Sequence, residues 1–344
     1  MELTIESEFN FRLGYGMTEQ EQLMALRGIR RGPYIGFNPV NATQIWQWCS
    51  VMGEQQVRYQ TGPDQVAPLA MMQMWTMRDY YDRYAPGSTS DRPYQVFDDM
   101  TDMGYDSNVA VSYDIEFVRH LRVGEWPRHY TTVVSISDQK TTSLGVGYFV
   151  TERVEYTTDT AEVFAYANIT YFQYRANASA PTASEVTPNA DIAVDISTPD
   201  VLNAGALALD WSSVKAGQSL VEWPLPISHR LIVGGALATQ DFIPVHHNVP
   251  AARAAGMPDI FMNILTTSGL VCTYINACVG DRGFIKNLKF SLMAPNVPGD
   301  IMTLQGQIQE LSTIDGMTEA RIEFAGKNGL GMHTQGSVLV AILN

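Results

Sequence analysis

The stretch PDIFMNILTTSGLVCTYINACV, residues 258–279, is one long apolar segment in the second half of the chain. Its length favours a buried helix over a strand, and Pro258 is tolerated in a first helical turn. The residues after it predict antiparallel strands, because β-branched and alternating stretches occupy 284–311, 317–327 and 336–344. This part of the sequence therefore predicts one helix wrapped by a curled antiparallel sheet, which is the hotdog arrangement.

The first half of the chain repeats the same order of parts. The shorter proline-headed segment 68–84 takes the place of the helix, and alternating stretches predict strands over 118–137, 143–157 and 162–175. Residues 86–108 lie between them as an insertion that predicts a loop or flap. Duplication at this spacing predicts an α+β double hotdog, with a long central helix in each half.

The two halves are separated by a stretch of different composition. Residues 176–203 are rich in Ala, Ser, Thr, Pro and Asp and have no clean period, which is typical of a linker. We therefore predict an N-terminal hotdog domain over 1–178, a linker over 179–204 and a C-terminal hotdog domain over 205–344.

The composition limits the partners of the protein. Its 344 residues are 45% hydrophobic and have a formal net charge of −14, which disfavours nucleic acid and anionic membrane surfaces. No apolar run approaches eighteen residues, and the N-terminus lacks a secretory pattern, so we expect no membrane span. Three cysteines (Cys49, Cys272 and Cys278) fit reduced thiols in a cytoplasm.

Asp241 and His246 are the strongest candidates for catalytic residues. They lie five residues apart with Pro244 between them, and this proline disfavours a helix, so both side chains can converge from a turn. A carboxylate and an imidazole that share one water can move a proton to and from an activated carbon. The alternative is that Asp241 caps the turn and His246 is a half-buried loop histidine.

The segment 238–264 resembles the signature of the R-specific enoyl-CoA hydratase (MaoC-like) family, whose pattern is Asp-x-Asn-Pro-Leu-His-x-Asp. The positions that match or conservatively replace it are Asp241, Pro244, Val245 and His246. Two positions depart from it, because Ile243 replaces the Asn and Asn248 replaces the last Asp. The resemblance continues to the C-terminus.

The resemblance implies a hydro-lyase that adds water to a trans-2-enoyl-CoA. Asp241 would be the base toward the water, and His246 would orient the water and relay the proton to the α-carbon. The backbone amide of Asn263 would stabilise the enolate at the start of the helix. No metal or redox cofactor is expected, since CoA is part of the substrate and no third ligand stands beside His246 and His247.

The first half resembles the degenerate dehydratase domain of two-domain family members. In residues 40–59, Glu54 takes the position of the Asp, Gln56 of the Asn, Val57 of the Pro and Tyr59 of the His. A Glu–Tyr pair is a poor hydratase couple because an unperturbed Tyr has a pKa near ~10. We therefore expect one active site per chain.

Substrate contacts are expected at two places. Basic side chains near the signature are candidates for CoA phosphates, with solvated surface charge as the alternative: Arg253, Arg282, Lys286 and Lys289. Adaptable apolar side chains of the first half are candidates for the acyl pocket, with ordinary core packing as the alternative: Met71, Met72 and Trp75. The degenerate half also resembles proteins of bacterial steroid and bile-acid side-chain breakdown, which implies a bulky steroid-like acyl group.

Two other functions remain open. Hotdog thioesterases also place a carboxylate beside the helix, although they do not require the turn at 244–246. The chain is alternatively a structural subunit for an aldolase, a thiolase or a second hydratase. A homodimer is also implied by the resemblance.

Overall fold

The computed structural model describes residues 18–142, 144–176, 207–314 and 316–343. The strands of the first half are β1 (Arg30–Ile35), β2 (Ser107–Phe117), β3 (Pro127–Ile136), β4 (Lys140–Thr141), β5 (Gly145–Thr158) and β6 (Val163–Ala176). Its helices are α2 (Glu19–Ala25), α3 (Ala42–Met52) and α4 (Gln95–Asp102), and its 3-10 turns are η1 (Val57–Tyr59), η2 (Leu69–Met71) and η3 (Met74–Thr76).

The second half contains β7 (Trp223–Ile227), β8 (Gly283–Leu292), β9 (Asp300–Ile314), β10 (Met317–Asn328) and β11 (Gly331–Leu343). Its helical elements are α6 (His229–Ala238), the 3-10 turn η4 (Pro244–His246), α7 (Val249–Ala254) and α8 (Ile264–Val279).

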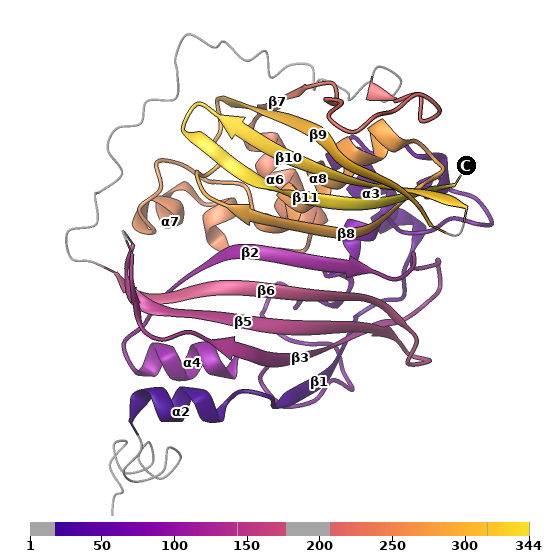
Figure 1. Ribbon diagram of the computed structural model, residues 1–344. Helices are drawn as coiled ribbons and strands as arrows, with labels where there is room; N and C mark the ends of the chain where they lie inside the picture. The colour runs from indigo at the N-terminus through magenta and orange to yellow at the C-terminus, as the bar shows by residue number, and fades with distance from the viewer. Residues whose placement is uncertain (1–17, 143, 177–206, 315, 344) are drawn as a thin grey trace, which may run out of the picture.

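All these strands belong to one 11-stranded sheet with the order β1-β3-β5-β6-β2-β8-β11-β10-β9-β7, and β4 pairs with β5. The strands of each half are contiguous, and antiparallel pairing of β2 with β8 joins them. Helices α3, α6 and α8 lie together on one face of the sheet (Figure 1). One hydrophobic core runs from the first half into the second. This architecture confirms the α+β double hotdog.

Helix α8 fills the middle of this core. Leu265 to Val279 are all buried, as the apolar run of the sequence predicts. The helix begins later than predicted, because Pro258 lies outside it and Asn263 is the N-cap. The Oδ1 atom of Asn263 accepts a hydrogen bond from the Thr266 backbone N–H at 2.8 Å, which satisfies one of the free donors of the first turn.

The prediction of a long central helix over 68–84 was wrong. Only the short turns η2 and η3 form there, and η2 packs against α8. A local side chain explains where helical order ends, because Asp79 Oδ1 accepts hydrogen bonds from the backbone N–H groups of Tyr81 (2.9 Å) and Arg83 (3.0 Å). An aspartate side chain that accepts hydrogen bonds from neighbouring backbone N–H groups in this way competes with helix formation.

Residues 86–108 are also more ordered than the predicted loop or flap. They contain α4 and the start of β2, and Figure 1 shows α4 beside α2 below β3. Leu23 of α2 packs with Val96 and Met100 of α4 in a second, smaller core against β3 and β5. The predicted linker over 179–204 lies outside the described residues. No helix in the described ranges is long and apolar enough to cross a membrane.

Candidate active site

Asp241 and His246 meet in the turn that follows α6. The helix ends at Ala238, Gln240 adopts a left-handed backbone conformation with φ of 55°, and η4 ends at His246. This reversal brings the Nε2 atom of His246 within 3.6 Å of the Oδ2 atom of Asp241. Both residues are buried, with relative exposures of 7% for Asp241 and 6% for His246. The structure thus brings together the two side chains that the spacing selected.

A backbone contact determines which nitrogen of His246 holds the proton. Its Nδ1 atom lies 2.7 Å from the carbonyl oxygen of Phe261. Because a carbonyl only accepts hydrogen bonds, Nδ1 must be the donor, and Nε2 of the neutral ring faces Asp241 with a free lone pair. The pair is therefore oriented for exchange of a proton at Nε2.

Asn263 ties this pair to the helix in a way that the sequence analysis missed. Its side-chain amide donates hydrogen bonds to Asp241 Oδ2 at 2.8 Å and to Thr239 Oγ1 at 2.9 Å. The predicted role was that of its backbone amide, whose N–H has no acceptor among the described residues. The same residue therefore fixes the carboxylate and offers a free donor at the N-terminus of α8.

The side chains at the two positions that depart from the family pattern lie outside these contacts, although the Ile243 backbone N–H donates to Asp241 Oδ1 at 3.4 Å. Ile243 is 51% exposed, and Asn248 caps α7 by accepting a hydrogen bond from the Ala251 backbone N–H at 3.1 Å. Asn263 supplies the amide donor to Asp241 in this structure, so the carboxylate is supported although Ile243 replaces the asparagine of the pattern.

A second, altered copy of the site lies at the other end of α8. Glu54 and Tyr59 follow α3 with the same spacing, and the Asn276 side-chain amide donates to Glu54 Oε2 at 2.8 Å. Burial raises the pKa of Glu54 and raises that of Tyr59 well above its usual value. The phenol of Tyr59 therefore keeps its proton at neutral pH, so this copy lacks a base at the position that His246 takes in the other.

The predicted phosphate contacts are dispersed over the molecule. Arg253 ends α7 near the pair, and its Nε donates to the Pro258 carbonyl at 3.2 Å. Arg282 follows the C-terminal end of α8, a helix of 16 residues and hence about 24 Å long. Lys286 is paired with Glu319 at 2.5 Å and Lys289 with Asp114 at 3.2 Å. Of the four, the structure brings Arg253 alone to the end of α8 that holds Asp241.

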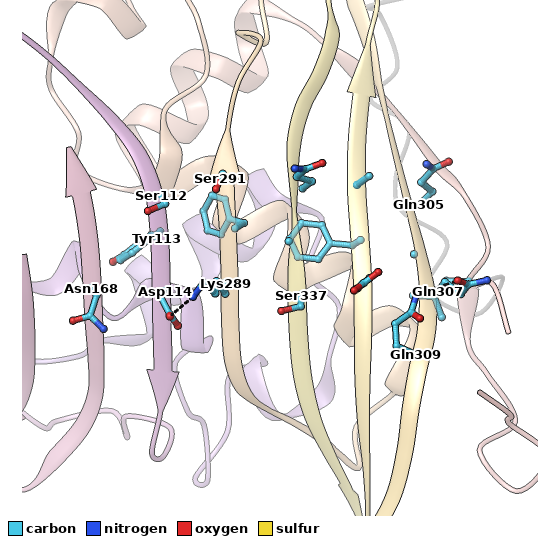
Figure 2. A pocket seen from close by; sticks show the side chains of 18 of the residues that line it. Ser112, Tyr113, Asp114, Asn168, Lys289, Ser291, Gln305, Gln307, Gln309 and Ser337 are labelled. Carbon is cyan, nitrogen blue, oxygen red and sulfur yellow. Dashed lines mark hydrogen bonds and ion pairs between the residues drawn. The ribbon is translucent and has the colours of Figure 1, made fainter. Parts of the chain in front are cut away.

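A large hollow lies on the outer face of the sheet, away from the pair. It has a volume of about 1050 Å³, and Figure 2 shows mostly polar side chains across it, together with the ion pair between Lys289 and Asp114. Neither Asp241 nor His246 lines it. Size alone therefore does not locate the candidate active site.

A small cavity of about 40 Å³ lies inside the first half, where a central helix is missing. Met71, Met72 and Trp75 are buried nearby, but the neighbouring Gln73, Thr76 and Met77 are the ones that line it. Two further lining residues that the sequence analysis missed are His129 and Glu152. The available signal was alternation, since Glu152 occupies an inward position between Val150 and Val154.

Known structures share this architecture. A MaoC-like dehydratase covers 94% of this chain and 100% of its own, with a TM-score of 0.69 and 17% identity. A Mycobacterium tuberculosis protein described as a double hotdog covers 93% of this chain and 97% of its own, with a TM-score of 0.55 and 12% identity. These likenesses show the fold, and the chain is a double hotdog protein.

Sequence relatives show the family, although no family model matches the chain. The β subunit of a Mycobacterium tuberculosis 3-oxo-4,17-pregnadiene-20-carboxyl-CoA hydratase is 37% identical over 122 residues, which are 36% of this chain and 92% of that subunit. A probable enoyl-CoA hydratase α subunit of Thermomonospora curvata is 34% identical over 159 residues, or 44% of this chain and 50% of that subunit. The chain belongs to the MaoC-like enoyl-CoA hydratase family.

Proposed function

We propose that this chain adds water to a trans-2-enoyl-CoA with a bulky fused-ring acyl group, and that Asp241 and His246 are its catalytic residues. The observation that carries the proposal is their buried pair, with Nε2 and Oδ2 3.6 Å apart and Asn263 bonded to the carboxylate. Reversible hydration needs an acid and a base that contact the same water molecule, and a buried pair of this kind provides them.

The reaction requires one proton to leave water and one to reach the substrate. A water between the two side chains attacks the β-carbon while Asp241 accepts its proton. The neighbouring Nε2 of His246 takes up that proton and delivers it to the α-carbon. The free amide of Asn263, at the positive end of α8, donates to the thioester oxygen as enolate charge develops. The reverse sequence dehydrates a 3-hydroxyacyl-CoA.

The absence of a central helix from the first half and the name of one relative support a bulky acyl group. Only the short turns η2 and η3 form where that helix was predicted. The relative from Mycobacterium tuberculosis is named for a pregnadiene-carboxyl-CoA, which is a fused-ring acyl-CoA. The reaction needs no metal or redox cofactor, and coenzyme A enters as part of the substrate.

The names of the relatives also bear on how this chain associates with other subunits. Both relatives are named as subunits of hydratases, one an α and the other a β subunit. We propose that this chain unites two hotdog units in one polypeptide, forms a homodimer and associates with an aldolase or thiolase. Sedimentation of the purified chain, alone and with such an enzyme, measures both associations.

The decisive experiment follows the loss of enoyl-thioester absorbance with a steroid enoyl-CoA and with crotonyl-CoA. We expect turnover of the steroid compound by the wild type, and a loss of roughly a thousandfold or more in Asp241→Asn and in His246→Ala. A parallel assay for free thiol detects a thioesterase. Inertness of the wild type toward both compounds would refute the proposed hydration.

A further inference from the structure

Glu152 is a carboxyl group in an unusual place. Its side chain points inward from β5 and is 1% exposed, between the apolar side chains of Val150 and Val154. Its Oε1 atom has no hydrogen-bond partner among the described residues. An unpartnered buried polar group costs free energy, so a water, an ion or a ligand group is expected to satisfy it.

His129 presents a second unpaired group to the same cavity. It points inward from β3, is 7% exposed, and its Nδ1 atom lacks a partner in the described part of the chain. The ring stacks on Tyr34, with centroids 4.8 Å apart and an interplanar angle of 29°. The imidazole is thus held in place by packing while its nitrogen stays available.

Tyrosines line this cavity, and another tyrosine of the same half contacts the turn that holds Asp241. Tyr94 and Tyr171 line the cavity, and burial raises their pKa values, with additional contributions from the charges of both Glu152 and Asp241. Tyr84 also lines the cavity, and it follows closely after Tyr80 in the chain. On the outer side, the ring of Tyr80 contacts Phe242, the residue after Asp241, at a centroid distance of 5.8 Å.

We propose that Glu152 and His129 bind a ketone oxygen at the far end of the fused-ring acyl group, while its enoyl thioester lies at Asp241. This rests on the proposed function and deepens it, because it names the polar feature by which the substrate is selected. The Glu152 carboxyl donates the hydrogen bond to the ketone, and the tyrosines pack against the rings between the two ends.

The protonation state and the space both suit this contact. Burial raises the pKa of Glu152 to about 8 and lowers that of His129 to about 3, so at neutral pH the carboxyl keeps its proton and the imidazole is uncharged. The charged or titratable side chains that interact with Glu152 come from several elements: Arg31, Tyr34, Tyr84, Tyr94, Tyr156 and Tyr171. The cavity offers about 40 Å³ to the centres of water-sized groups, and one water needs about 10–15 Å³ on this measure, so a small polar group fits.

Two substrates that differ at one atom test the inference. One is a fused-ring enoyl-CoA with a ketone at the end far from the thioester, and the other has a methylene group in its place. The ratio of their kcat/KM values is measured with the full chain for wild type, Glu152→Gln, Glu152→Met and His129→Phe. Glu152→Gln keeps a donor of the same shape, whereas Glu152→Met removes it and conserves volume. His129→Phe keeps the ring that stacks on Tyr34.

We expect wild type and Glu152→Gln to prefer the ketone by about tenfold or more, because the methylene leaves a buried donor unpaired. Glu152→Met should lower the ratio to near one while it still hydrates the methylene compound, and His129→Phe should lower the ratio in part. An equal rate for both compounds in the wild type, or a full preference in both Glu152→Met and His129→Phe, would overturn the inference and leave the hydratase assignment intact. Inertness of the wild type toward both compounds would overturn the proposed function as well.

Discussion

At the scale of single residues, Asn263 links the stability of a helix to the geometry of the pair. Its Oδ1 caps α8 through Thr266 N, and its Nδ2 donates to Asp241. Because serine also caps helices but has no amide donor, Asn263→Ser separates these two contributions. The difference in stability between Asn263→Ser and Asn263→Ala then gives the contribution of the helix cap.

We predict that Asn263→Ser lowers kcat/KM about tenfold to a hundredfold, as the loss of a supporting hydrogen bond to a catalytic group typically does. Its free energy of unfolding should stay close to that of the wild type, whereas Asn263→Ala should lose about 1 kcal/mol more. Denaturant titration and enoyl-CoA kinetics on the two variants measure these effects. Full activity of Asn263→Ser would show that the amide only supports the fold.

At the scale of elements, the pair depends on the close approach of α6 to α8. A Cβ atom added at Gly235 would lie 2.3 Å from Thr266 Oγ1, so α6 packs this near only with glycine there. At Gly234 the same addition would meet Val51 methyl groups at 3.6 Å, an ordinary contact. These adjacent glycines therefore form a matched test.

We predict that Gly235→Ala destabilises the fold by about 1–3 kcal/mol, the usual cost of overpacking, and lowers activity because Asp241 moves away from Asn263. Gly234→Ala should be neutral or slightly stabilising, since alanine is favoured over glycine inside a helix. Thermal unfolding and hydration assays on both variants compare the sites. Equal behaviour of the two would contradict the close approach.

The elements also show what local sequence patterns can and cannot predict. The apolar run before Val279 predicts α8 because nearly every side chain in it is buried, and the spacing of Asp241 and His246 predicts their meeting because Pro244 forces a turn. The segment 68–84 has similar apolar content, yet it forms turns. The hydrogen bonds that the Asp79 carboxylate accepts from the backbone N–H groups of Tyr81 and Arg83 are a local detail, and the occupation of the centre by α8 is a tertiary one. Composition reveals neither of them.

At the scale of the whole molecule, the two halves share one sheet but differ in what they bury. The second half surrounds α8 with apolar side chains, while the first half encloses Glu152 and His129 beside several tyrosines. The sequence analysis did not predict this difference, although the alternation of Val150, Glu152 and Val154 was a signal that the carboxyl points inward. A buried acid of this kind should make the stability of the entire fold depend on pH.

Burial raises the pKa of Glu152 to about 8 from the ordinary value of 4.5. Between these pH values the folded chain keeps a proton that the unfolded chain releases, so the free energy of unfolding falls as pH rises. The full contribution is present below pH 4.5 and is lost as pH passes 8. Glu152→Gln has no such proton, and other titrating groups cancel when the two proteins are compared.

We therefore predict that the free energy of unfolding of Glu152→Gln rises relative to that of the wild type by about 1 kcal/mol per pH unit across this window. Urea titrations of both proteins between pH 5 and about pH 9 measure the difference, with Val154→Ala as a neutral-residue control whose difference from wild type should not change with pH. Parallel curves for Glu152→Gln and wild type would mean that the carboxyl is ionised in the folded state at neutral pH. It would then lack the proton that a ketone has to accept, so this measurement of stability also tests the recognition proposed for the acyl group.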